Sequence, residues 1–122
     1  MTISCKILYV DDEPMNLLLF ESMFDKTHTV FTAESPEEGL NMLRDDNFQV
    51  VVSDMKMPEM SGIEFIEVAK QNYPDIVYYI LTGYHITQDI KNAIDRKLIK
   101  KYFQKPFSKA EIEKAIAQDV SD

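Results

Sequence analysis

One apolar run in the middle of the chain, residues 48–53, limits most strongly what the sequence can fold into. Val50, Val51 and Val52 are consecutive in it, and Asp54 follows the run directly. A strand with one face in water alternates apolar and polar residues, whereas an unbroken apolar strand is buried on both faces. Burial on both faces is typical of a parallel sheet covered by helices on each side. The run therefore predicts the central strand of an α/β protein.

Four further apolar runs and five helical patterns alternate along the chain. The other strands are predicted at residues 5–10, 29–32, 76–81 and 101–104, and the helices at 14–24, 35–45, 61–72, 87–98 and from 108 onward. Ser-x-x-Glu patterns at Ser35, Ser61 and Ser108 predict a capping box at the start of three helices. Because crossovers between parallel strands are right-handed, this alternation favours a doubly wound sheet of five parallel strands, (βα)5.

Length and charge limit the function classes. The chain of 122 residues fits one domain, residues 1–122, and its net charge of −8 argues against a broad basic surface for nucleic acid. Cys5 is the only cysteine, which excludes an intrachain disulfide and favours a cytoplasmic protein. No apolar run has the length of a membrane span, and the first residues do not form a signal-peptide pattern, so we expect neither a membrane anchor nor a leader.

Polar side chains follow four of the predicted strands at the point where each strand ends. They are the pair Asp11 and Asp12, then Asp54, Thr82 and Lys105. The carboxyl ends of parallel strands meet at one edge of the sheet, where ligands of such folds bind, so we expect these side chains to lie together.

The chemistry of this cluster indicates a metal-dependent phosphate site. Three neighbouring carboxylates repel one another unless a cation binds between them, and their hard oxygens favour Mg²⁺. Asp54, alone at the end of the most apolar strand, is the best nucleophile for a phosphoryl group, with Asp11 and Asp12 as metal ligands. Lys105 and Thr82 would bind the phosphoryl oxygens.

Each of these residues also has a simpler interpretation when taken alone. Asp12 or Glu13 could cap a helix that begins at Pro14, and Asp54 and Thr82 could be ordinary turn residues. A lone Lys105 is most often a solvated charge, and His28, without a metal-ligand spacing, is best read as a surface residue. The occurrence of all four groups at strand ends favours the functional interpretation.

The sequence closely resembles the receiver domain of two-component response regulators over nearly its whole length. The resemblance rests on the acidic residues 11–13, the segment DMKMPEMSG at 54–62, Thr-Gly at 82–83 and Lys-Pro-Phe at 105–107. It implies the flavodoxin-like strand order 2-1-3-4-5. It also implies that Asp54 accepts a phosphoryl group from the phosphohistidine of a sensor histidine kinase or phosphotransfer protein. Such a domain is a regulator and not an enzyme, apart from limited self-catalysed phosphorylation and dephosphorylation.

The resemblance assigns roles around the metal. Mg²⁺ would be held by Asp12, Asp54 and the backbone carbonyl of Lys56, with Asp11 acting through water. The backbone N–H groups of Lys56 and Gly83 would face the phosphate. The bond between Lys105 and the proline that follows it is expected to be cis, which a fold can lock in at small cost.

The resemblance also implies a switch. Thr82 would move toward the phosphate and Tyr102 would turn inward behind it, although Tyr102 could be an ordinary strand aromatic. The readout surface would comprise the fourth helix, fifth strand and fifth helix, roughly residues 87–117, and would contact an effector domain or a second copy. Lys56 and Tyr84 occupy positions that influence phosphoryl lifetime in similar domains, which suggests a moderately long-lived phosphoryl state.

Three rival functions predict other residues at these positions. A phosphatase of the haloacid dehalogenase type needs a second aspartate two residues after its nucleophile, where this chain has Lys56. A flavodoxin-like FMN carrier needs a Ser/Thr/Gly-rich phosphate loop after the first strand, where residues 11–14 are Asp-Asp-Glu-Pro. A pseudo-receiver that only binds partners would lack an acceptor, metal or lysine position, and none of these is missing.

Overall fold

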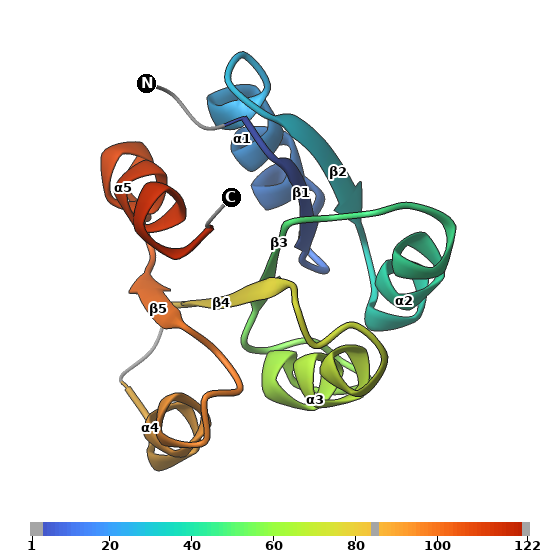
Figure 1. Ribbon diagram of the computed structural model, residues 1–122, viewed down its shortest axis with the longest axis vertical. Helices are drawn as coiled ribbons and strands as arrows, with labels where there is room; N and C mark the ends of the chain where they lie inside the picture. Colours follow the sequence, from blue (N-terminus) through green and yellow to red (C-terminus); the bar gives the residue numbers. More distant parts are fainter. Residues whose placement is uncertain (1–3, 84–85, 121–122) are drawn as a thin grey trace.

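Five parallel strands form the centre of the computed structural model, which describes residues 4–83 and 86–120. Their order in the sheet is β2-β1-β3-β4-β5, so the order 2-1-3-4-5 and the α/β doubly wound class are confirmed (Figure 1). The strands are β1 (Lys6–Val10), β2 (Thr29–Ala33), β3 (Val50–Asp54), β4 (Val77–Thr82) and β5 (Lys101–Gln104).

Five helices, counted over the part of the chain that the structure describes, cover the two faces of this sheet. Helices α1 and α5 pack on one face, and α2, α3 and α4 pack on the other (Figure 1). None of the described helices is long and apolar enough to cross a membrane. Their bounds are α1 (Pro14–Phe24), α2 (Pro36–Asp45), α3 (Gly62–Asn72), α4 (Gln88–Asp95) and α5 (Lys109–Asp119).

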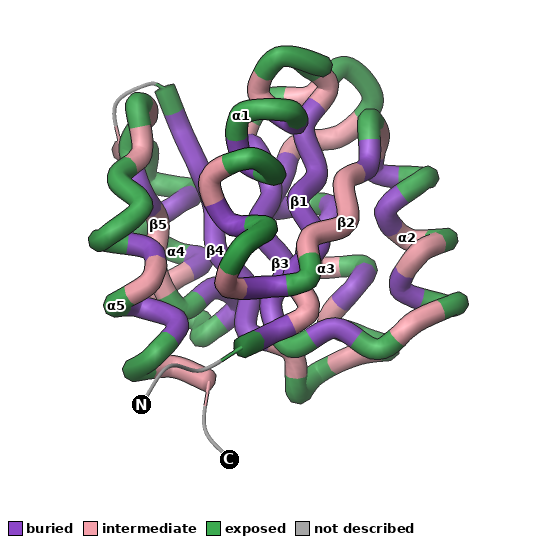
Figure 2. The backbone as a smooth tube through the Cα atoms, turned by 90° about the horizontal axis from the view of Figure 1, so that it is seen from above, coloured by how far each residue is buried: buried purple, intermediate pink, exposed green. Residues whose placement is uncertain are grey.

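The central strand is buried on both faces, as its unbroken apolar run predicts. Val50 and Val52 lie in the core beneath α1 and α5, while Val51 lies in the core beneath α2, α3 and α4. All three are fully buried, and Figure 2 shows β1, β3 and β4 as the buried centre of the molecule. Successive side chains of a strand point to opposite faces, so each face needs its own apolar residues.

The capping boxes are confirmed in part. The box at Ser61 is complete, because its hydroxyl accepts from the N–H of Glu64 and the Glu64 carboxylate accepts from the N–H of Ser61. Ser35 and Ser108 accept the corresponding bonds of α2 and α5. A complete box at Ser35 would also need a hydrogen bond from the Ser35 N–H to the Glu38 carboxylate. That prediction is wrong, because the Glu38 carboxylate accepts from the N–H of Glu34 instead.

The fourth helix ends earlier than the periodicity predicts. Helix α4 stops at Asp95, and Lys97 adopts a left-handed conformation with φ of 62°. The N–H of Lys97 then bonds to the carbonyl of Ile94, and the N–H of Leu98 bonds to the carbonyl of Ala93. This pair of bonds is a Schellman motif, which closes a helix C-terminus. The apolar Leu98 therefore belongs to the chain after the helix, where it is buried.

The prediction that His28 lies on the surface is wrong. Its side chain is buried, its Nδ1 accepts from the N–H of Cys5 at 2.9 Å, and its Nε2 lies 2.7 Å from the Glu113 carboxylate. Because Nδ1 accepts a bond, the proton of the neutral ring is on Nε2 and is donated to Glu113. The histidine thus fastens α5 to the start of β1.

Candidate functional site

The carboxyl ends of β1, β3, β4 and β5 bring together the polar residues that the sequence singles out. Asp54 ends β3 and lies opposite Leu81 in the register with β4, and Thr82 ends β4 one residue later. Asp11 and Lys105 each follow directly on their strand. The edge lies beside β1 and β3, where the chain order of the sheet reverses, and this is where open α/β sheets bind ligands.

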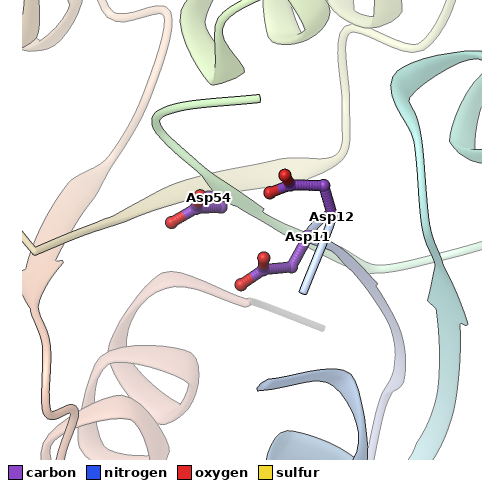
Figure 3. Close-up of side chains that lie close together, drawn as sticks. All are labelled: Asp11, Asp12 and Asp54. Atoms are coloured by element: carbon purple, nitrogen blue, oxygen red, sulfur yellow. The ribbon is translucent and has the colours of Figure 1, made fainter. Parts of the chain in front are cut away.

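Three carboxylates form the centre of the site. Asp11, Asp12 and Asp54 each offer one oxygen, and these oxygens all lie within 4.8 Å of one another (Figure 3). Asp11 is fully buried and Asp54 is 8% exposed, while Asp12 is half-buried. Three hard oxygen donors at this separation fit a divalent cation such as Mg²⁺, which is bound by few protein ligands and keeps several waters.

Three residues close to Asp11 in the sequence donate hydrogen bonds that hold its carboxylate in place. The Tyr9 hydroxyl donates to its Oδ2 at 2.5 Å, and the Asn16 amide donates to the same oxygen at 3.2 Å. The N–H of Glu13 donates to its Oδ1 at 3.0 Å. Glu13 is the residue before α1 but makes no side-chain cap, so a capping role for it is wrong. Sequence reasoning missed Tyr9, although a strand places residues 9 and 11 on the same face.

Lys105 joins the cluster and is not a solvated charge. Its ammonium lies 2.6 Å from Asp54 Oδ1 and 3.4 Å from Asp11 Oδ2. The bond between Lys105 and Pro106 is cis, as predicted. The Lys105 N–H also donates to the Thr82 carbonyl at 2.8 Å, which joins the ends of β4 and β5.

Burial and charge shift the proton affinities of this cluster. Burial raises the pKa of Asp54 above its usual range, the ion pair with Lys105 opposes this, and the neighbouring Asp11 charge adds to the rise. For Lys105, burial lowers the pKa and pairing with Asp54 raises it, and the net direction is upward. The site is therefore short of positive charge, because one ammonium does not compensate three close carboxylates.

A groove lies beside the cluster and borders it at Asp12. It measures about 510 Å³ and is lined by Asp12, Lys56 and Thr82 together with the apolar side chains of Met55 and Met57. Thr82 is itself only 1% exposed. The structure thus brings a carboxylate, a lysine and a hydroxyl to the same opening. Tyr84 lies outside the described residues.

The close approach of α3 fixes the backbone of Asp54. A Cβ atom added to Gly62 would lie 2.3 Å from the Asp54 carbonyl oxygen, a separation that only a glycine permits. The Gly62 N–H also donates to the Met55 carbonyl at 2.8 Å, and the Ser53 hydroxyl donates to the Asp54 carbonyl at 2.9 Å. The backbone at the end of β3, where Asp54 lies, therefore has little freedom.

Tyr102 lies apart from the acidic cluster. It is half-buried on β5, opposite Ile80 in the register, and it packs against the core beneath α4. It also lines a groove between α4, β5 and α5. The structure thus places it on the predicted readout surface.

A family model and curated proteins match the chain. The model for the response regulator receiver domain matches residues 7–117. The chain is similar to the transcriptional regulatory protein GlrR of Escherichia coli (strain K12), with 32% identity over 90% of this chain and 25% of that protein. It is also similar to the transcriptional regulatory protein FlgR of Helicobacter pylori, with 35% identity over 84% of this chain and 26% of that protein. The chain thus spans about a quarter of the length of these relatives.

Solved structures match nearly the whole chain. A response regulator receiver domain protein from Clostridium thermocellum superposes with a TM-score of 0.83 at 32% identity, covering 94% of this chain and 93% of that one. The signal receiver domain of an HD domain-containing protein from Pseudomonas fluorescens Pf-5 superposes with a TM-score of 0.88 at 25% identity, covering 96% and 94%.

Proposed function

The chain belongs to the response regulator receiver domain family of two-component systems, and from this premise we propose that Asp54 is its phosphoryl acceptor. A receiver domain is a phospho-acceptor signalling module, so the remaining question is which side chains perform the transfer. Asp54 is supported by its position at the end of the central strand, within reach of two further carboxylates and one ammonium. No observation favours the pseudo-receiver alternative.

The transfer is a nucleophilic displacement at phosphorus. A carboxylate oxygen of Asp54 attacks the phosphorus of a phosphohistidine, the P–N bond breaks, and the imidazole leaves with that electron pair and takes up a proton. The product is an aspartyl phosphate. The groove lined by Asp12, Lys56 and Thr82 is the opening through which the donor would approach.

The metal ligands proposed are Asp11, Asp12, Asp54 and the backbone carbonyl of Lys56. The close spacing of the three carboxylates supports this set. A bound Mg²⁺ would supply the positive charge that the attacking carboxylate and the transferred group need. Asp11, held by Tyr9, Asn16 and the Glu13 N–H, would keep its position whether or not the ion is bound.

Lys105 and Thr82 are proposed to bind the phosphoryl oxygens, and Thr82 and Tyr102 to form the switch. The Lys105 ammonium already lies 2.6 Å from Asp54 Oδ1, so it needs only a small shift to reach an oxygen of the transferred group. Thr82 ends the strand next to Asp54 and lines the same opening. A phosphoryl group carries about −1.5 to −2 charge but replaces the single charge of the Asp54 carboxylate, so it adds roughly one negative charge and three acceptor oxygens, which can bias a two-state element.

We further propose that residues 1–122 act as one receiver domain in the cytoplasm, phosphorylated by a sensor histidine kinase or a phosphotransfer protein. Its catalysis would be limited to its own phosphorylation and dephosphorylation. The surface formed by α4, β5 and α5 would carry the output to an effector domain or a second copy. The relatives GlrR and FlgR are called transcriptional regulatory proteins, which supports an output in transcription made by a part of the protein outside these residues.

The proposal rests on one observation, the close spacing of the side chains of Asp11, Asp12, Asp54 and Lys105. The test incubates the purified chain with a small-molecule phosphoryl donor and Mg²⁺ and measures its intact mass. We expect the mass of one phosphoryl group on the wild type, and none on Asp54→Asn or after chelation of the metal. Phosphorylation of Asp54→Asn at the wild-type rate would place the acceptor elsewhere.

A further inference from the structure

Two aspartates compete for the ammonium group of Lys105. The ammonium lies 2.6 Å from Asp54 Oδ1 and 3.4 Å from Asp11 Oδ2, and the two carboxylates lie close together (Figure 3). Both are buried, and a low dielectric strengthens the attraction that each exerts on an ammonium group. Burial alone therefore does not decide between them, and the preference of Lys105 for Asp54 needs a further cause.

Three donors share one oxygen of Asp11. Besides Lys105 at 3.4 Å, its Oδ2 accepts from the Tyr9 hydroxyl at 2.5 Å and from the Asn16 amide at 3.2 Å. The bond from Tyr9 is the shortest of the three and has the length of a charge-assisted hydrogen bond between two oxygens. It occupies lone-pair space of Oδ2 that an ammonium group would otherwise use. Asp11 is therefore well satisfied without a close approach of Lys105.

The core fixes the ring of Tyr9, and with it the position of the hydroxyl. Tyr9 is fully buried on β1, and its ring stacks on that of Phe20 with the centroids 4.3 Å apart. The ring of Phe107 also packs on Phe20, at 5.7 Å between centroids, and Phe107 lies two residues after Lys105. A tyrosine hydroxyl keeps its proton at neutral pH and a carboxylate only accepts, so Tyr9 is the donor. One aromatic cluster thus supports both the donor to Asp11 and the loop of Lys105.

We propose that Tyr9 is a positioning residue of this site: its hydroxyl satisfies Asp11 and thereby leaves Lys105 with Asp54. The inference rests on the proposed function, because it explains how an ammonium group is kept beside the proposed phosphoryl acceptor. Without the hydroxyl, the buried carboxylate of Asp11 would be short of a donor, and the flexible side chain of Lys105 would turn toward it. Asp54 would then lose the positive charge that stabilises the transferred group.

The simpler interpretation is that Tyr9 is a core aromatic whose hydroxyl takes the nearest acceptor, and Tyr79 provides a matched control for it. Tyr79 is also fully buried, on β4, and its hydroxyl donates to the Asp119 carboxylate at 2.7 Å. That carboxylate also pairs with a lysine, Lys101, at 2.7 Å. Lys101 begins β5, whereas Lys105 follows the end of the same strand. Removal of either hydroxyl thus takes one donor from a lysine-paired carboxylate, but at opposite ends of β5.

The experiment determines crystal structures of Tyr9→Phe and Tyr79→Phe without metal or phosphoryl donor. In Tyr9→Phe we expect the Lys105 ammonium to move to about 2.8 Å from Asp11, the usual length of a charge-assisted hydrogen bond, and away from Asp54. In Tyr79→Phe it should stay with Asp54, although urea unfolding should show a similar loss of stability for both variants. With saturating Mg²⁺ and a small-molecule donor, phosphoryl transfer should be about tenfold slower in Tyr9→Phe than in Tyr79→Phe, because a displaced stabilising charge loses part of the roughly 100-fold effect of its removal.

A third variant tests whether Asp11 is the competitor. In Tyr9→Phe/Asp11→Asn the neutral amide does not attract the ammonium group by charge, so Lys105 should return to Asp54. Lys105 at its wild-type distances in Tyr9→Phe, an equal displacement in Tyr79→Phe, or a displacement that persists in the double variant would overturn the proposal. Equal transfer rates in the two single variants would do the same. A wild type that is not phosphorylated on Asp54 would contradict the proposed function and not the role of Tyr9, which the metal-free structures decide.

Discussion

Gly62 offers a direct test of how the scaffold positions Asp54. Its φ lies outside the left-handed region, so the backbone conformation alone would accept alanine. The surrounding atoms leave no room for an alanine side chain, because a Cβ added to Gly62 would lie 2.3 Å from the Asp54 carbonyl oxygen and 2.8 Å from Ile80 Cδ1. The Ile80 methyl group can rotate away, whereas the carbonyl can move only if the end of β3 moves. Gly62→Ala should therefore disturb both stability and phosphoryl acceptance.

The size of the effect follows from two opposing contributions. Overfilling a packed site costs about 1–3 kcal/mol, and the upper end applies where backbone must shift. Replacing glycine by alanine in a helix returns at most about 1 kcal/mol. We expect Gly62→Ala to lower the free energy of unfolding by about 2 kcal/mol, or the melting temperature by roughly 8 °C.

Gly39→Ala is the matched control, because Gly39 is also helical but its added Cβ would meet only side-chain ends, Val10 Cγ2 at 3.0 Å and Phe65 Cζ at 3.2 Å. Crowding of about 1 kcal/mol should then cancel the gain in helix propensity. Urea unfolding with an unchanged m-value measures both variants, and phosphoryl transfer is timed where each is fully folded. Stability of Gly62→Ala within about 0.5 kcal/mol of wild type, or transfer as fast as in Gly39→Ala, would refute the reasoning.

Three further outcomes are expected. Burial raises the pKa of Asp54, so the folded state loses stability as the pH rises through that pKa and the carboxyl group ionises. At pH 7 without metal, the free energy of unfolding of Asp54→Asn should therefore be about 1 kcal/mol higher than that of the wild type. That difference should vanish in acid, and urea titrations at several pH values measure it. Lys97→Gly should stabilise the left-handed helix end by about 1 kcal/mol, and an unchanged urea midpoint would contradict this. Lys56→Ala/Tyr84→Ala should lose a phosphoryl label faster than wild type, and equal decay of the two labelled proteins would remove any shielding role for these residues.

The strands and the membership of the site could be predicted because both depend on local patterns. An apolar run such as residues 50–52 identifies a strand buried on both faces, and the polar residue after such a strand must lie on the carboxyl edge of a parallel sheet. Asp11, Asp54, Thr82 and Lys105 reach one site by this rule alone. The order of the strands was available only through the family resemblance, because apolar periodicity does not say which strands are neighbours.

What the sequence did not yield depends on contacts between distant segments. His28 meets Glu113 and the N–H of Cys5, and no local pattern links these three residues. Helix α4 ends because Lys97 adopts a left-handed conformation that lysine rarely adopts. Helix ends are usually predicted from a glycine at this position, so the sequence does not indicate this one. The ion pair between Lys105 and Asp54 likewise depends on the fold, because the two residues are 51 positions apart and the Lys105 side chain must reach past the end of β4, which lies between β3 and β5.

The register of the sheet indicates how the proposed phosphorylation of Asp54 can affect the groove between α4, β5 and α5, which Tyr102 lines. Thr82 pairs with Gln104 and Ile80 pairs with Tyr102, and residues in register on parallel strands face the same side. Ile80 and Tyr102 both contact the core beneath α4, so Thr82 lies on that side too. Lys105 is already in place before phosphorylation and has little distance to travel. A displacement of Thr82 toward a phosphoryl group would instead open space on the same face of the sheet, two residues beyond the Ile80–Tyr102 pair. A Tyr102 ring that moved into this space would change the floor of the groove.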